Sequence, residues 1–153
     1  MRYRIFTQTP DGNFDPQRLA HNARLFFRSK VEVLEQEPQR LRLRLQGELS
    51  ETPVELTLEK RQVQAEDRKD VTDAERRGNA AGMGALASRC RFLWEVSVPE
   101  DVPSSAALAL CAATASVALG PVLPPDGSTL LGARDAIERA TGTQRLEKAR
   151  PAG

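Results

Sequence analysis

Hydrophobic and polar residues alternate strictly in two neighbouring segments of the chain. Residues 40–46 read RLRLRLQ, and residues 54–61 begin VELTLEK. Because a β-strand points successive side chains to opposite faces, this alternation predicts two strands that each have one leucine-rich or valine-rich face. Gly47 and Pro53 lie between the segments and favour a turn, so the pattern predicts a β-hairpin.

One register of this hairpin suits both faces of the two strands. On the hydrophobic face it pairs Leu45 with Val54, Leu43 with Leu56, and Leu41 with Leu58. On the other face it sets Arg44 against Glu55, Arg42 near Thr57, and Arg40 against Glu59. A shift of one residue would move the leucines to the solvent face, so we expect this register.

Three further strands are predicted at residues 2–7, 30–35 and 92–98, each by an alternating pattern that ends near a turn residue or a proline. The first helix is predicted to begin at Pro16, because Asp15 can cap it and proline suits the first helical position. This helix should place one apolar side on the core and a charged side in solvent.

The second half of the chain predicts three more helices. The charged segment at residues 65–73 is expected to be a loop, and Thr72 with Glu75 forms a capping-box pattern that predicts a helix to about Arg91. Residues 104–119 predict an uncharged helix that ends at a Gly-Pro pair, and residues 130–141 predict a last helix that ends before Gly142.

The order of these elements predicts an α+β domain. We expect a mainly antiparallel sheet of about five strands, with helices packed on one face. A ferredoxin-like core with two added C-terminal helices is one topology that fits this order. Residues 1–142 are expected to form a single domain, and residues 143–153 a frayed tail.

Charge and composition narrow the classes of partner. The 153 residues carry 22 Lys and Arg against 21 Asp and Glu, which gives a formal net charge of +1. Proteins that neutralise phosphates usually have a marked basic excess, so the charge balance disfavours a nucleic-acid partner. The N-terminal segment lacks the apolar stretch of a secretory signal, which favours a cytoplasmic protein.

The uncharged segment is long enough to raise the question of a membrane span. Residues 104–123 contain seven alanines but only four leucines. Transfer of alanine and serine into lipid gains too little free energy to drive insertion of this segment. We therefore expect no membrane contact and a buried helix at residues 104–119. Because all sides of this helix are apolar or small, either the rest of the fold or a second copy in a homodimer should cover it.

The residues that could carry catalysis or bind a metal are few. His21 is the only histidine and falls on the charged side of its helix, so a solvated side chain is expected. Cys90 and Cys111 lack the spacing of a metal-binding pair and lie in alanine-rich segments, which favours two buried thiols. The sequence therefore predicts no catalytic residue, no metal site and no cofactor.

The alternative hypothesis is that the protein binds a small molecule. The helix predicted at residues 72–91 contains three glycines, which favour close packing against a neighbour and do not match a phosphate-binding loop. A small-molecule enzyme or ligand-binding domain would place a pocket between this helix and the sheet, near Met83, Trp94 and Asp126.

The main functional hypothesis is non-catalytic binding of another protein. The predicted hairpin gathers charges of both signs on its outer face, from Arg40, Arg42, Arg44, Glu55 and Glu59. Rows of opposite charge can orient a protein partner and exclude others. A regulator, an adaptor or an immunity protein would each fit such a surface.

Overall fold

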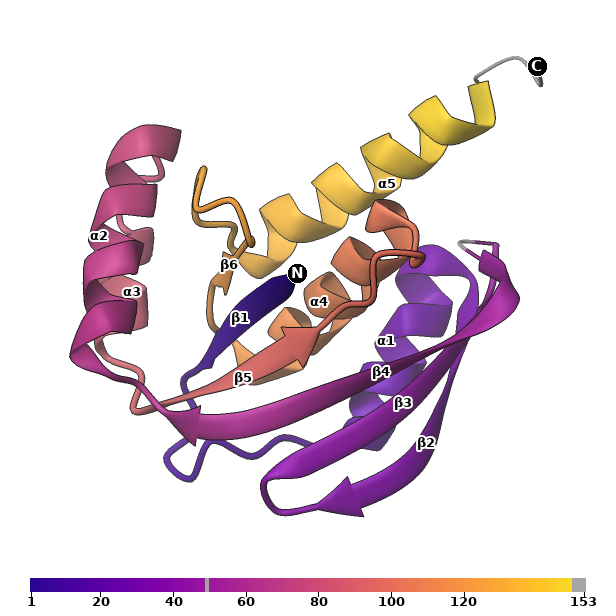
Figure 1. Ribbon diagram of the computed structural model, residues 1–153, viewed down its shortest axis with the longest axis horizontal. Coiled ribbons are helices and arrows are strands. Elements are labelled where there is room, and N and C mark those ends of the chain that lie inside the picture. The colour runs from indigo at the N-terminus through magenta and orange to yellow at the C-terminus, as the bar shows by residue number, and fades with distance from the viewer. Residues whose placement is uncertain (49, 150–153) are drawn as a thin grey trace.

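The computed structural model describes the backbone of residues 1–48 and 50–149 and the side chains of residues 1–48 and 52–142. Six strands form one antiparallel sheet in the order β2-β3-β4-β5-β1-β6 (Figure 1). The strands are β1 (Arg2–Thr7), β2 (Ser29–Glu37), β3 (Arg40–Gly47), β4 (Ser50–Gln62), β5 (Phe92–Ser97) and β6 (Val122–Leu123). The α+β class and the antiparallel sheet are confirmed, with one short strand more than predicted.

The sheet order does not confirm a ferredoxin-like core. Strands β2 to β5 follow one another as neighbours in the sheet, whereas β1 lies between β5 and β6. The first strand of the chain therefore pairs with two strands from its second half, Arg2 opposite Ser97 and Ile5 opposite Val122.

The register of the central hairpin is as predicted. Strand β3 pairs with β4 through Leu45 and Val54, Leu43 and Leu56, Leu41 and Leu58 on the inner face, and through Arg44 and Glu55, Arg42 and Thr57, Arg40 and Glu59 on the outer face. All six inner side chains are buried. Burial of one complete face fixes the register, because a slip would expose every one of these side chains.

Helices α1 (Pro16–Phe27) and α4 (Ser104–Ala118) cover the inner face of the sheet, and α5 (Ala133–Ala149) packs against α4 (Figure 1). Asp15 caps α1, as predicted, by accepting a hydrogen bond from the Gln17 amide at 2.9 Å. Leu19 and Phe27 of α1 and Trp94 of β5 belong to the main core.

A smaller core lies on the opposite face, at the β5-β1-β6 end of the sheet. Helices α2 (Ala65–Gly78) and α3 (Met83–Ser88) cover it, so helices pack on both faces rather than on one. Phe6 and Leu93 point into this core and are buried there. Leu93 is apolar on the otherwise polar side of its strand for this reason.

The segment from residue 65 to residue 91 differs from its prediction. The predicted loop at residues 65–73 is wrong, because α2 already begins at Ala65, where the amide of Gln64 donates to the side chain of Asp67 at 2.7 Å. The expected capping box at Thr72 therefore lies inside α2. The predicted long helix is two helices, because Asn79 and Gly82 both take positive φ values.

Helix α4 is the uncharged helix, and 12 of its 15 residues are buried. It contacts α1, α5 and β1. Of the two alternatives for this helix, burial inside the fold or a contact in a homodimer, the structure shows the first. In the described part of the chain no helix is both long and apolar enough to cross a lipid bilayer.

The last helix starts and ends later than predicted. Leu131 precedes α5 and forms an isolated bridge with Val122, which fixes the turn before the helix. Helix α5 continues through Gly142 to Ala149, where the sequence predicts a frayed tail; residues 150–153 lie outside the described residues.

The chain makes a close backbone approach just after α4. A Cβ atom at Gly120 would overlap the carbonyl oxygen of Phe6. Two hydrogen bonds fix this approach, from the Phe6 amide to the Pro121 carbonyl and from the Gln8 amide to the Ala118 carbonyl, both at 3.0 Å. Only a residue without a side chain fits between α4 and β1 at this point.

Candidate functional site

The outer face of strands β2, β3 and β4 carries three rows of charge. The middle row is basic and both neighbouring rows are acidic, and we call this surface the charged face: Glu32, Glu35, Arg40, Arg42, Arg44, Glu55 and Glu59. The five residues predicted from the sequence all lie on it. Every member is exposed or half-buried, because the main core lies on the other side of these strands (Figure 1).

Ion pairs link the three rows. The guanidinium group of Arg44 lies between two carboxylates, 3.2 Å from Glu32 and 3.1 Å from Glu55. Arg42 lies 3.8 Å from Glu35, and Arg40 faces Glu59 in the β3–β4 register. Ion pairs at this level of exposure add little to stability but hold side chains in defined positions.

The acidic row of β2 is the part of this surface that the sequence analysis missed. Glu32 faces Arg44 because β2 pairs with β3 over its whole length. Charged and apolar residues already alternate at the start of the segment KVEVLE, but the strand that pairs with β2 was not predicted. A β-bulge between Val33 and Glu35 brings Glu35 opposite Arg42.

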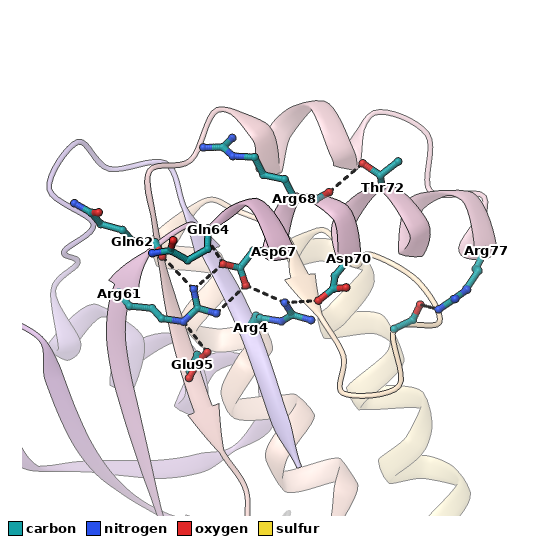
Figure 2. Close-up of polar contacts among 11 residues, drawn as sticks. Arg4, Arg61, Gln62, Gln64, Asp67, Arg68, Asp70, Thr72, Arg77 and Glu95 are labelled. Atoms are coloured by element: carbon teal, nitrogen blue, oxygen red, sulfur yellow. Dashed lines mark hydrogen bonds and ion pairs between the residues drawn. The ribbon is translucent and has the colours of Figure 1, made fainter.

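A second group of charges lies beside the charged face, at the start of α2, and was also missed (Figure 2). Asp67 is 2% exposed and accepts hydrogen bonds from Arg61 at 2.6 and 2.7 Å and from Arg4 at 2.9 Å. Arg61 also donates to Glu95 at 2.7 Å, and Arg4 forms an ion pair with Asp70 at 2.9 Å. We call these five residues the Asp67 network.

The electrostatics of the Asp67 network follow from its hydrogen bonds. Burial alone would raise the pKa of Asp67, but donation by Arg61, by the Gln64 amide and by Arg4 outweighs burial and lowers the pKa to about 2. The hydrogen bond to Asp67 raises the pKa of Arg61 above its ordinary value. All the charges are internally paired, so this network ties α2 to strands β1, β4 and β5.

The structure does not bring the predicted pocket residues together. Trp94 lies on the inner face, where its indole nitrogen donates to the Gly12 carbonyl at 2.8 Å and its ring contacts Phe14. Met83 packs against the small core on the opposite face, so the sheet separates it from Trp94. Asp126 lies in the turn before α5, away from both of these residues, and lines a cavity beside Tyr3.

His21 and the two cysteines were considered from the sequence for catalysis or metal binding. His21 is exposed on α1, as predicted. Among the described residues no group of three or more His, Cys, Asp or Glu side chains could hold a metal ion.

Both thiols are buried and free of disulfide bonds. Burial raises the pKa of Cys90 to about 11 and raises that of Cys111 further. We expect neither thiol to react with iodoacetamide at pH 8 in the folded protein, and both to react in 6 M guanidinium chloride. Mass spectrometry of the alkylated chain measures this, and labelling of the folded protein at a rate near that of free cysteine would contradict it.

Comparisons of the chain with protein-family models, with curated proteins and with solved structures give no match.

Proposed function

We propose that this chain binds another protein through the charged face of strands β2, β3 and β4. The observation that carries the proposal is the position of that face. Helices cover the inner face of the same strands, whereas the three rows of charge on the outer face remain exposed or half-buried. An open sheet face with fixed charges of both signs is suited to the recognition of a complementary protein surface.

The alternation of the rows favours a protein partner over a nucleic acid. A phosphate backbone that approached the arginines of β3 would also meet the glutamates of β2 and β4, since Arg44 lies within 3.2 Å of both neighbouring rows. Nucleic-acid binding needs net positive charge over the contact. A protein can instead present acidic and basic groups in matching rows.

The charged face is held in place before any partner arrives. Leu43 and Leu56 anchor β3 and β4 from below, and both are at most 1% exposed. Side chains that are already oriented lose less conformational entropy on binding, so a preformed array of ion pairs supports specificity. Regulation, adaptor activity and neutralisation of a toxin are the roles that this kind of contact serves.

The proposal predicts that exchanging the charges of two facing residue pairs strongly reduces partner capture. The variant combines Arg44→Glu with Glu55→Arg and Arg40→Glu with Glu59→Arg. Because these residues face one another in the β3–β4 register, each exchange keeps opposite charges across the two strands while it inverts the pattern shown to a partner. Glu32, which pairs with Arg44, loses that one ion pair in the variant. We expect at least a tenfold loss of captured partner, since like charges then meet across the contact.

The measurement is affinity capture from native lysate of the source cells, followed by mass spectrometry of the retained proteins. The matched control exchanges the exposed pair Arg134 and Glu138 of α5, whose charged atoms lie 3.3 Å apart. The control should retain the same partner as the unchanged chain, and all three proteins should melt within about 3 °C of one another. Equal capture by the β3–β4 variant would refute the charged face as the contact.

A further inference from the structure

The solvent side of α1 carries basic side chains and no acidic ones. Arg18, His21 and Arg24 are exposed along the helix, and Arg28 follows them, also exposed, at the C-cap. Side chains three or four residues apart are neighbours on a helix surface, so these groups lie on one side of α1. The helix contains no Asp or Glu. This side of the molecule is therefore locally positive, although the net charge of the whole chain is only +1.

Most of this positive charge is not neutralised within the fold. The guanidinium groups of Arg18 and Arg24 make no ion pair or hydrogen bond with another described residue. Arg28 has one ion pair, with Glu48, in which the charged atoms are 3.9 Å apart. On the charged face, in contrast, an acidic row flanks the arginines on each side. The arginines of α1 are therefore free to attract an external anion.

Exposed apolar side chains accompany these arginines. Leu25 and Phe26 of α1 are 65% and 39% exposed. Leu119, which is 61% exposed, follows Ser116 by three residues at the end of α4, and the Ser116 hydroxyl accepts a hydrogen bond from Asn22 of α1 at 2.8 Å. Three of the four large apolar side chains that are exposed in the described part of the chain thus lie on α1 or beside it.

A surface that combines free arginines with protruding apolar groups is suited to an anionic lipid membrane. Arginines attract the charged headgroups, and apolar side chains can enter the headgroup layer. Duplex DNA offers phosphates but presents little apolar surface to the exposed leucines. An acidic protein would have to provide a groove that fits the helix, whereas fluid lipid headgroups can adjust to it.

From these observations we infer that α1 is a peripheral contact for anionic lipid membranes. Arg18, Arg24 and Arg28 lie among the headgroups, and Leu25 enters the headgroup layer between them. Surface binding of this kind differs from insertion of residues 104–123, which the sequence argues against. Because α1 packs on the side of the sheet opposite to the charged face, the inference does not depend on the proposed protein partner (Figure 1).

Co-sedimentation of the full chain with lipid vesicles tests the inference. We expect at least about tenfold stronger partition onto phosphatidylcholine vesicles with roughly 40% phosphatidylserine than onto phosphatidylcholine alone. Raising NaCl from about 0.05 M to about 0.5 M should weaken binding to the charged vesicles about tenfold, because salt screens the attraction. Arg18→Gln combined with Arg24→Gln should lower the partition coefficient about tenfold.

The matched control combines Arg76→Gln with Arg89→Gln. It removes the same charge from two exposed arginines outside α1 and should leave partition within about twofold of the unchanged chain, since distant charges are screened. Leu25→Ser tests the apolar part of the contact. It keeps every charge and should lower partition about threefold.

Three results would overturn the inference. Equal partition onto charged and neutral vesicles would refute an anionic lipid contact, and equal losses from the α1 variant and its control would refute α1 as the surface. Tighter binding of polyglutamate or of duplex DNA than of the charged vesicles would assign α1 to an acidic macromolecule instead of lipid. These measurements use the purified chain, so none of them bears on partner capture by the charged face.

Discussion

Replacing Asp67 with Ala is expected to lower the free energy of unfolding by about 3 kcal/mol, because it leaves two arginines without their buried partner. Asp67 is 2% exposed and receives three hydrogen bonds from arginine side chains. It also accepts from the Gln64 amide, so the first turn of α2 loses its anchor as well. Urea unfolding followed by circular dichroism measures the change.

Asp70→Ala is the matched control for this variant. Asp70 also pairs with Arg4, at 2.9 Å, but its side chain is 39% exposed, and this is its one ion pair among the residues with described side chains. The control should therefore cost less than about 1 kcal/mol. Equal losses from the two variants would contradict the central role of Asp67 in joining α2 to the sheet.

The lowered pKa of Asp67 also predicts a dependence of stability on pH. Its pKa is about 2 in the folded chain against an ordinary value of 3.8. The contribution is therefore complete above pH 3.8 and is lost as the pH falls through 2. It amounts to about 2 kcal/mol, and Asp67→Asn should remove this part of the acid dependence. Unfolding curves between pH 2 and pH 6 would show the difference.

Gly120→Ala is expected to cost about 3 kcal/mol, at the upper end for an overpacked site. The added Cβ atom would overlap the carbonyl oxygen of Phe6. The backbone at this point cannot move away easily, because hydrogen bonds before and after Gly120 join the neighbouring residues to β1 and the residue that follows it. Thermal unfolding should show a fall in Tm of about 6 to 12 °C for a domain of this size.

Gly142→Ala provides a control of opposite sign. Gly142 lies inside α5, and a Cβ atom there would meet nothing within 4 Å. Alanine is the better helix former, so this variant should gain about 0.5 to 1 kcal/mol. If both variants changed stability in the same direction, the close approach of α4 to β1 would not be the cause of the Gly120 effect.

The sequence predicts those parts of the fold that depend on local periodicity. The six cross-strand pairs of β3 and β4 could be predicted because one short turn joins the strands and both faces constrain the register. The pairing of β1 with β5 and β6 could not be predicted, because no local signal joins residues so far apart in the chain. The first half of α2 was missed because it is rich in charge and its apolar side is narrow, with Val71 and Ala74 as its buried apolar residues.

The same limit applies to the candidate sites. The basic row of β3 and its partners in β4 follow from the hairpin pattern, whereas the acidic row of β2 requires the order of strands. The Asp67 network depends on three elements that meet only in the folded chain, β1, β4 and α2 (Figure 2). The cavity beside Tyr3 joins β1 to residues more than 100 positions later, and only Asp126 among its lining residues was predicted.

The position of β1 constrains the route by which a nascent chain acquires its structure. Strands β2, β3 and β4 are joined by short turns and can pair soon after synthesis of residue 62. Strand β1 is made earlier but has no partner strand until residues 92–97 exist. Until then Tyr3, Ile5 and Phe6 lack their final neighbours, so closure of this distant pairing, rather than hairpin formation, should limit the rate of folding.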